Sequence, residues 1–308
     1  MTLIVNVINN YFSTKELYRF SAAQHLDSAF RGISRKSFNV KGQLYVKFSG
    51  EDGQDYGGPR REFFRLALKE LINSSLFEGQ ESQKYFSHDV TSLDAGRYRL
   101  AGRLVALSLA QDGPGLLSLN TDLYDLMTGW SQKCQYFVSI LYLYFRTSGE
   151  ITEFTRGIND VGHLWDVVTE HAVLFKPVFC HKATTLNKDV VDHLCDINFS
   201  YSGSNARKKE EETIYSWEVI LQDMQDGNVP ITLEELLEFI IGAGQIPLCG
   251  FKKKIDIIFY DQEDGVTRLP SVSTCGLLMW FPRGVGEPDN LFPLIQTAVE
   301  GSPGFYKI

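Results

Sequence analysis

A change of hydrophobic pattern near residue 203 constrains the fold of this chain more than any other feature. Before that point, apolar residues recur mostly at the spacing of amphipathic helices. Beyond it, helical patterns are followed by continuous apolar stretches that are typical of buried strands. The segment SYSGSN at 200–205 separates the two patterns and has the small, polar composition of a flexible linker. We therefore expect an α+β protein of two domains, a mostly helical one over 1–203 and a smaller mixed one over 204–308.

Local patterns predict the elements of these domains. The alternation in QLYVKFS at 43–49 predicts a half-buried strand. Pro59 has the fixed φ of a first helical turn, and RREFFRLALKELIN after it places Phe64, Leu68 and Leu71 on one stripe. Arg61, Arg65 and Lys69 fall on another stripe, so this segment reads as an amphipathic helix. Further helices are expected at 97–111, 133–146, 160–175, 187–196, 210–226, 232–241 and 289–300, and further strands at 254–260 and 276–281.

Charge and hydropathy exclude several classes of function. The 30 Lys and Arg residues against 38 Asp and Glu residues give a net charge of −8, which argues against a general nucleic-acid binder. The longest apolar run, Phe137 to Phe145, is too short to span a bilayer. The first residues lack the basic start and cleavage site of a signal peptide. We expect a cytoplasmic or nuclear protein with neither nucleic acid nor membrane as a partner.

The charge run RKKEEE at 207–212 is interpreted as a solvated first helical turn with i,i+4 Lys–Glu pairs.

The five cysteines are scattered and odd in number, which indicates reduced thiols and no disulfide framework. Cys180, His181, His193 and Cys195 could in principle supply four zinc ligands. Adjacent ligands at 180 and 181 point in divergent directions in most backbones, so packed cysteines and ordinary histidines are favoured over a metal site. No metal and no other cofactor is expected.

Cys275 gives the strongest local signal for chemistry. It ends the proline-bearing loop RLPSVSTC at 268–275, directly before an apolar strand, so its sulfur is expected to be accessible. The hydroxyls of Ser273 and Thr274 could hydrogen-bond a thiolate there. Nucleophilic cysteine chemistry requires thiolate character and access. On spacing alone, a structural role for this cysteine remains an open alternative. The other cysteines, Cys134, Cys180, Cys195 and Cys249, lie in or beside segments interpreted as helical or buried.

Five blocks, in order along the chain, carry a family resemblance. They are FSGEDGQDYGGPRREFF at Phe48–Phe64, YRLAGRLVALSL at Tyr98–Leu109, Trp217 with LLEFIIGAGQIPLCGF at Leu236–Phe251, LPSVSTC at Leu269–Cys275, and the ending GFYKI with Phe305 fourth from the end. Together they resemble the catalytic domain of HECT-type ubiquitin ligases. The sequence that follows the cysteine, from Pro282 to Val285, resembles most that of the HECT-like domains found with PHD fingers.

The resemblance implies a bilobal fold and a two-step reaction. The N-lobe, shortened here and placed at 1–203, would bind the ubiquitin-conjugating enzyme, and the C-lobe at 204–308 would carry the nucleophile beyond a flexible hinge. Cys275 would accept ubiquitin as a thioester and pass it to a lysine of a substrate protein. Thr274 and Ser273 would shape the active-site loop, and Phe305 would act from the C-terminal tail. The implied partners are ubiquitin, a conjugating enzyme and a substrate protein, and the family requires no metal or cofactor.

Two departures from the family pattern leave alternatives open. Ser273 stands where the family carries a histidine, and the family's VTxxN segment is not found between about 146 and 200. The apolar stretch HAVLFKPVF at 171–179 either replaces part of the enzyme-binding surface or belongs to the core, and we favour the core. The alternatives to an active ligase are a HECT-like scaffold without efficient transfer, and a cysteine-dependent hydrolase. The hydrolase would need a histidine partner, and no pattern places His163, His171, His181 or His193 near the cysteine.

Overall fold

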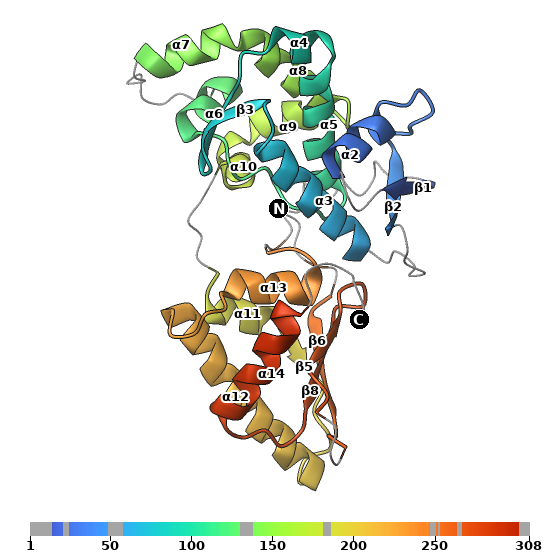
Figure 1. The fold of residues 1–308 in the computed structure, drawn as a ribbon, viewed down its shortest axis with the longest axis vertical. Coiled ribbons are helices and arrows are strands. Elements are labelled where there is room, and N and C mark those ends of the chain that lie inside the picture. Colours follow the sequence, from blue (N-terminus) through green and yellow to red (C-terminus); the bar gives the residue numbers. More distant parts are fainter. Residues whose placement is uncertain are drawn as a thin grey trace. The chain divides into compact units, whose positions relative to one another are not determined.

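The computed structural model describes residues 14–20, 25–48, 58–129, 138–180, 186–244, 246, 251, 253–263 and 267–301 (Figure 1). Helices and strands are mixed throughout, which confirms the expected α+β class. The chain divides into two compact units. The first comprises Met1–Asp55, Arg60–Ala183 and Pro247–Cys249, and the second comprises Tyr56–Pro59, Thr184–Ile246 and Gly250–Ile308.

The first unit is mainly helical. Its strands are the parallel pair β1 (Thr14–Phe20) and β2 (Gly42–Phe48) and the antiparallel hairpin of β3 (Phe77–Gln80) and β4 (Gln83–Phe86). Its helices are α2 (His25–Ile33), α3 (Gly58–Ile72, in this unit from Arg60 on), α4 (Val90–Asp94), α5 (Arg97–Ala110), α6 (Thr121–Thr128), α7 (Val138–Arg146), α8 (Ser148–Asn159), α9 (Leu164–Glu170) and α10 (Ala172–Phe179). The strand expected at 43–49 and the helix expected after Pro59 are confirmed.

Helices α5 and α8 cross at very close range in the centre of the first unit. A Cβ atom on Gly102 would overlap the carbonyl oxygen of Phe154, and one on Gly157 would overlap the carbonyl oxygen of Arg99. Each glycine therefore admits the backbone of the other helix. Arg99 and Arg103 also hold Asp160, just beyond α8, at 2.7 and 2.5 Å. The RLAGRL segment thus forms a buried helix contact.

The prediction of one helix over 160–175 is wrong, because the helical conformation is interrupted twice there. Gly162 and His163 adopt left-handed φ values of 63° and 55°, which separate α8 from α9. The side chain of Asn159 then accepts the backbone N–H of Trp165 at 2.8 Å and stabilises the start of α9. Helix α10 begins separately at Ala172. Hydrophobic spacing continued across these breaks, and the spacing alone did not reveal them.

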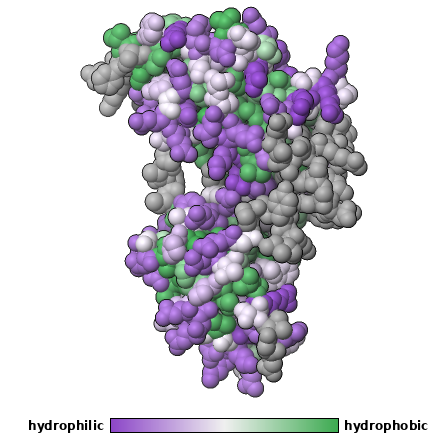
Figure 2. Space-filling view, in the orientation of Figure 1, coloured by the Kyte–Doolittle hydropathy of each residue, from purple (hydrophilic) through white to green (hydrophobic). Residues whose placement is uncertain are grey.

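Two helices of the first unit expose apolar side chains. On α7, Val138, Tyr142 and Phe145 are 82%, 64% and 68% exposed, at helical spacing. Apolar side chains gather over this helix at one end of the unit (Figure 2). On α10, Val173 and Leu174 are exposed. The other apolar residues of α10, which are Ala172, Phe175, Val178 and Phe179, are buried, so the 171–179 stretch is mainly core, as favoured. Among the described residues, no helix is long and apolar enough to cross a membrane.

The second unit is built on a four-stranded sheet of order β5-β6-β8-β7. Its elements are α11 (Lys188–Leu194), β5 (Cys195–Ile197), α12 (Asn205–Asp226), α13 (Leu233–Ile241), β6 (Ile255–Tyr260), β7 (Ser271–Ser273), β8 (Leu278–Pro282) and α14 (Pro288–Glu300). Strands β5, β6 and β8 are parallel, and β7 is antiparallel to β8. The strands expected at 254–260 and 276–281 are confirmed as β6 and β8, and both lie in the middle of the sheet.

One hydrophobic core joins this sheet to its helices. Trp217 of α12 packs against Phe281 of β8 with ring centroids 5.0 Å apart. Leu236 of α13 and Leu291 of α14 are fully buried in the same cluster. Along β6 the burial alternates at Ile255, Ile257 and Phe259, as expected of a strand with one face on the core. Helices α12 and α14 lie side by side in this unit (Figure 1).

The boundary between the compact units lies between Ala183 and Thr184, about twenty residues before the position expected near 203. The segment 188–199 belongs to the second unit because Val191 enters its core and β5 pairs with β6. The expected linker, SYSGSN at 200–205, is consequently a loop inside the second unit. Ser200 binds the side chain of Glu210, and Ser204 accepts the backbone N–H of Arg207 as the N-cap of α12.

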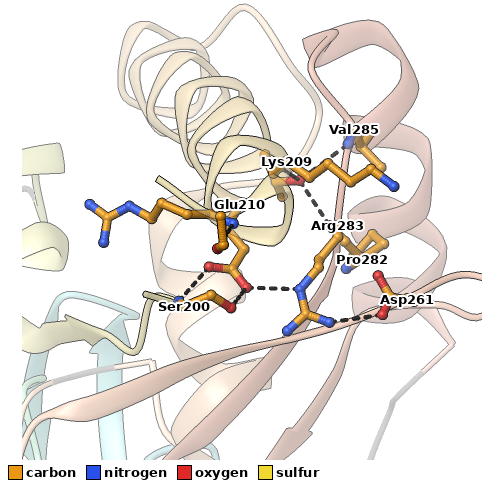
Figure 3. Close-up of polar contacts among 10 residues, drawn as sticks. Ser200, Lys209, Glu210, Asp261, Pro282, Arg283 and Val285 are labelled. Carbon is orange, nitrogen blue, oxygen red and sulfur yellow. Dashed lines mark hydrogen bonds and ion pairs between the residues drawn. The ribbon is translucent and has the colours of Figure 1, made fainter. Parts of the chain in front are cut away.

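The charge run at 207–212 is only partly solvated. Arg207 pairs with Glu211 at 2.6 Å on the surface, which has the expected i,i+4 spacing with an arginine in place of the expected lysine. Glu210 is instead fully buried, and its carboxylate accepts hydrogen bonds from the backbone N–H and hydroxyl of Ser200 at 2.7 and 2.6 Å. Arg283 donates to it at 2.8 Å and reaches Asp261 at 3.1 Å (Figure 3). The expectation of a fully solvated first turn is therefore wrong for Glu210, whose charge has partners supplied by distant segments.

Candidate active site

Cys275 lies in a tight turn between β7 and β8. The antiparallel register pairs Ser273 with Leu278, so four residues, 274–277, connect the two strands. Cys275 is the second of these four, and it is half-buried. The loop expected over 268–275 is thus shorter than predicted, because its residues 271–273 form the edge strand β7. The thiol sits on a hairpin connection instead of at the end of a long open loop.

Hydrogen bonds and packing hold this turn at both ends. At its start, the hydroxyl oxygen of Ser273 accepts the backbone N–H of Gly276 at 3.1 Å. At its end, the carbonyl oxygen of Leu277 accepts the backbone N–H of Asp256 in β6 at 2.9 Å. The Leu277 side chain is buried in the core of the second unit, and its φ of 50° is left-handed. A leucine adopts this conformation only where its surroundings enforce it.

The approach to β7 is also fixed. The hydroxyl of Tyr260 donates to the carbonyl oxygen of Arg268 at 2.7 Å. The side-chain amide of Gln262 donates to the same carbonyl at 2.8 Å and accepts the backbone N–H of Arg268 at 3.0 Å. The guanidinium of Arg268 stacks over the Tyr260 ring at 4.5 Å. Pro270, at the start of the strand, is buried. The segment that leads to Cys275 is therefore anchored along its length.

The other described cysteines differ from Cys275 in their surroundings. Cys180 is 2% exposed, and burial raises the pKa of its thiol to about 12, against the lowering effect of Lys176. Burial, together with the charge of Asp192, raises the pKa of Cys195 to about 12 as well. A thiol with such a pKa is almost entirely protonated near neutral pH and is a poor nucleophile. Cys134 and Cys249 lie outside the described residues.

Of the remaining predicted site residues, Ser273 and Thr274 lie beside Cys275, and Phe305 is outside the described residues. Thr274 is in the turn beside Cys275 and is half-buried. Ser273 is in the last position of β7, with its hydroxyl oxygen engaged by Gly276. Phe305 lies outside the described residues, so its place relative to the turn stays a prediction. Sequence reasoning missed the Ser273–Gly276 hydrogen bond, although a serine three residues before a glycine in a hairpin connection is a signal for such a turn.

The histidines and the metal-ligand candidates do not converge on Cys275 in the described structure. His193 belongs to the second unit, and its Nδ1 lies 3.1 Å from the carbonyl oxygen of Asp189 on α11. His163 and His171 belong to the first unit, and His181 lies outside the described residues. The described residues hold no group of three or more His, Cys, Asp or Glu side chains that could bind a metal ion.

Comparisons with known proteins point to ubiquitin ligases. No protein-family model matches the chain. The G2/M phase-specific E3 ubiquitin-protein ligase of Gallus gallus is 24% identical over 294 residues, covering 76% of this chain and 39% of that protein. Its counterpart in Homo sapiens is 24% identical over 299 residues, covering 78% and 41%. The E3 ubiquitin-protein ligase HECW2 of Homo sapiens is 38% identical over 95 residues, covering 27% and 6%. This chain spans about two fifths of the length of the relatives that it matches most extensively.

Proposed function

We propose that this chain is a HECT-type ubiquitin ligase domain in which Cys275 carries ubiquitin as a thioester. The observation that carries the proposal is the position of Cys275 in a four-residue hairpin connection, together with burial that raises the pKa of the Cys180 and Cys195 thiols to about 12. The similarity to E3 ubiquitin-protein ligases supports ubiquitin transfer in general. The resemblance of LPSVSTC to the family's active-site loop supports the choice of cysteine.

The reaction proceeds in two steps that conserve bonds and charge. The Cys275 thiolate attacks the thioester carbonyl on the conjugating enzyme, and a new C–S bond forms as the enzyme's cysteine leaves as a thiolate. One thioester replaces another, so this step is nearly isoenergetic. The amine of a substrate lysine then attacks the new thioester, forms the isopeptide bond, loses a proton and releases the Cys275 thiolate. Each step needs good positioning of the thiol more than strong activation.

The two compact units divide the work in this proposal. The first unit acts as the N-lobe and binds the conjugating enzyme, and the second acts as the C-lobe with the nucleophile. Thr274 and Ser273 shape the loop, and Phe305 assists the transfer to lysine from the tail. We also propose, from the resemblance at Pro282–Val285, that the chain is related most to the HECT-like domains found with PHD fingers. The reaction takes place in the cytoplasm or the nucleus, where thiols remain reduced.

We assign the docking of the conjugating enzyme to the exposed face of α7. Val138, Tyr142 and Phe145 form an apolar stripe that a partner helix or loop could cover, whereas α10 exposes only Val173 and Leu174 beside one another. Exposed apolar patches on otherwise polar surfaces commonly mark protein interfaces. Tyr142→Asp should therefore weaken charging by raising the half-saturating concentration of the conjugating enzyme, and Leu174→Asp on α10 is the matched control. Equal effects of the two changes would contradict the assignment.

A charging assay tests the proposed function. The protein is mixed with a panel of ubiquitin-loaded conjugating enzymes and resolved with and without reductant. The wild type should form a reductant-sensitive adduct, and Cys275→Ala should form none. Cys275→Ser should form a reductant-resistant oxyester, because a hydroxyl replaces the thiol at the same place. Cys195→Ala should charge as the wild type does. An adduct that persists in Cys275→Ala would assign the nucleophile elsewhere.

The alternative is a HECT-like scaffold that retains the fold without efficient transfer. Ser273 at the place of the family's histidine is the observation that favours it. Under this alternative, no conjugating enzyme charges the folded wild-type protein, yet the enzyme still binds the first unit. Binding measured without transfer, in protein whose Cys275 reacts readily with a small alkylating reagent, would therefore decide for the scaffold.

A further inference from the structure

We propose that Ser273 is a positioning residue for Cys275, and that its hydroxyl oxygen fixes the direction in which the turn presents the thiol. This inference rests on the proposed ligase function. It assigns to Ser273 a task different from that of the imidazole which the family carries at this position. The serine acts on the backbone of the turn and leaves the chemistry to the cysteine.

The contact that carries the inference is local and specific. The Ser273 hydroxyl oxygen accepts the backbone N–H of Gly276 at 3.1 Å, across the residue that bears the thiol. That N–H belongs to the peptide unit that joins Cys275 to Gly276. Because a peptide unit is planar, holding its N–H fixes the backbone on the C-terminal side of Cys275. A Cβ atom on Gly276 would approach the same hydroxyl oxygen to 3.0 Å, so the glycine leaves room for this close contact.

The far end of the turn is already immobile. Leu277 is anchored by its buried side chain and by the hydrogen bond from Asp256 to its carbonyl oxygen. Its left-handed φ of 50° shows that the core determines its backbone. Ser273 itself belongs to a paired strand. On the N-terminal side of Cys275, the turn packs against Gly58, where an added Cβ atom would overlap the Thr274 hydroxyl and lie 2.9 Å from the Cys275 sulfur. The Ser273 hydroxyl holds the peptide unit on the C-terminal side.

Loss of this hydrogen bond should affect transfer more than thiol chemistry. Thioester exchange requires a defined approach of the sulfur to a carbonyl carbon, and small misplacements cost large factors in rate. A small alkylating reagent approaches from any open direction and depends mainly on thiolate fraction and exposure. A positioning role therefore predicts that the two reactions separate in a Ser273 variant. An electrostatic role predicts that they change together.

The experiment compares Ser273→Ala, Ser273→Thr and Ser273→His with the matched control Ser271→Ala. Ser271 lies two residues earlier on the same strand, and its hydroxyl has no hydrogen-bond partner among the described residues. Single-turnover charging by one loaded conjugating enzyme gives the saturating rate and the half-saturating concentration. Alkylation of Cys275 by iodoacetamide across a pH series gives the midpoint of its reactivity.

Ser273→Ala should lower the saturating charging rate about tenfold, with the half-saturating concentration and the alkylation midpoint unchanged. Ser273→Thr should recover most of the rate because it keeps the hydroxyl, and Ser271→Ala should match the wild type. Ser273→His should charge more slowly than the wild type, since it loses the hydroxyl oxygen that holds the turn. A faster Ser273→His, an unaffected Ser273→Ala, or a shifted alkylation midpoint in Ser273→Ala would each overturn the proposal.

A second measurement separates this inference from the proposed function. If the wild type accepts ubiquitin from no conjugating enzyme, the ligase proposal fails, and hydrogen exchange of the Gly276 amide still tests the turn. That amide should exchange about tenfold faster in Ser273→Ala than in the wild type, Ser273→Thr or Ser271→Ala, because a single protecting hydrogen bond is lost. Equal exchange in all four proteins would overturn the role of Ser273.

Discussion

Strands β5 and β7 form the two edges of the sheet in the second unit, and a cysteine lies beside each of them. Cys195 begins β5 directly after α11, and it packs against the core. Cys275 follows β7 in a hairpin connection that the Ser273 hydroxyl holds, and its sulfur lies beside Gly58, where an added Cβ atom would approach it to 2.9 Å. Both lie at the end of the sheet where the parallel strands begin, since Cys195 pairs with Ile255 and the next residue of β6 pairs with Leu278.

The difference between the two edges is a difference in the connecting segment. A helix that runs directly into a strand closes over its junction, and burial then raises the pKa of the Cys195 thiol to about 12. Cys275 instead lies in a four-residue connection between antiparallel strands, where its side chain is half-buried, as that of Cys195 is. Strand position alone therefore does not select a nucleophile. The surroundings of the sulfur do, because burial of the Cys195 sulfur beneath the junction of α11 and β5 suppresses its ionisation.

The largest effect expected from this comparison is on thiol reactivity. At about pH 8, a thiol of pKa about 12 carries on the order of one thiolate per ten thousand molecules. In the native protein, Cys275 should therefore be alkylated at least ~1000-fold faster than Cys195. Timed iodoacetamide labelling with peptide mass spectrometry measures both rates. In denaturing urea the ratio should fall to within a few fold. A native ratio near one would remove the distinction between the two edges.

The buried carboxylate at the other end of the sheet should control stability. Glu210→Ala leaves Ser200 without its acceptor and Arg283 with the exposed Asp261 alone, and it should cost about 3–5 kcal/mol of unfolding free energy, measured by urea titration. The control Glu211→Ala removes an exposed i,i+4 pair and should cost less than about 0.5 kcal/mol. Freed of Ser200, the end of β5 should loosen, so Cys195 should gain reactivity while Cys275 gains little. Similar costs for the two glutamate variants would contradict the burial of Glu210.

The same carboxylate predicts an acid dependence of stability. Burial by itself would raise the pKa of Glu210, but hydrogen bonds from Ser200 and Arg283 hold it below its usual value. The stabilisation is therefore present above the unfolded-state pKa and is lost as the pH falls through the folded-state value. Glu210→Gln should be less stable than the wild type near neutral pH, and the difference should shrink in acid. Parallel pH profiles of the two proteins would show that Glu210 does not titrate in this way.

The buried thiols predict a dependence of stability on alkaline pH. Because the folded-state pKa of Cys195 is raised, the stabilisation is fully present below the unfolded-state value of about 8.5 and is lost as the pH rises toward about 12. Above about pH 9, the wild type should lose roughly 1.4 kcal/mol per pH unit more than Cys195→Ala does. Cys180→Ala should likewise reduce the slope of unfolding free energy against alkaline pH, here through a thiol of the first unit. Unfolding titrations at several pH values give the slopes, and identical slopes would refute the burial of these thiols.

The smallest effect concerns the loop at 200–205. Gly203 has a φ of 81° with open space around its Cα, so Gly203→Ala should cost about 1 kcal/mol through backbone strain alone. The exposed neighbour offers the control Ser202→Ala, which should be neutral. A freely moving hinge would tolerate alanine at 203 or gain stability from it. A neutral or stabilising effect of Gly203→Ala would therefore support the interpretation of residues 200–205 as a flexible hinge.

Much of the local structure was determined by the sequence alone. The helices expected at 97–111, 232–241 and 289–300 and the strands expected at 254–260 and 276–281 are all present within two residues at each end. These predictions rest on contacts between residues three or four apart in a helix, or on alternation along one strand. Such patterns are complete within a single segment and need no distant partner.

The candidate site was predictable only in part. The family resemblance pointed to Cys275, and residue spacing left its role open. The sequence also placed Ser273 and Thr274 beside it. It did not show that residues 271–273 pair as an edge strand, nor that the connection is four residues long. Both features depend on the register of β7 against β8, and that register is set by the burial of Met279 and Leu277 in a core shared with helices α11, α12, α13 and α14.

Tertiary structure alone decided which charged and polar residues are buried. The run RKKEEE looks solvated because its partners are absent from its neighbourhood, yet Glu210 is held by Arg283, 73 positions away. Residues 188–199 look like the end of a helical domain, yet β5 joins a sheet whose next strand begins at Ile255. In both cases, burial of a group is favourable only once a distant segment satisfies its hydrogen bonds or covers its apolar face. The sequence around a buried group does not show which distant segment will contact it, so only the tertiary structure identifies that segment.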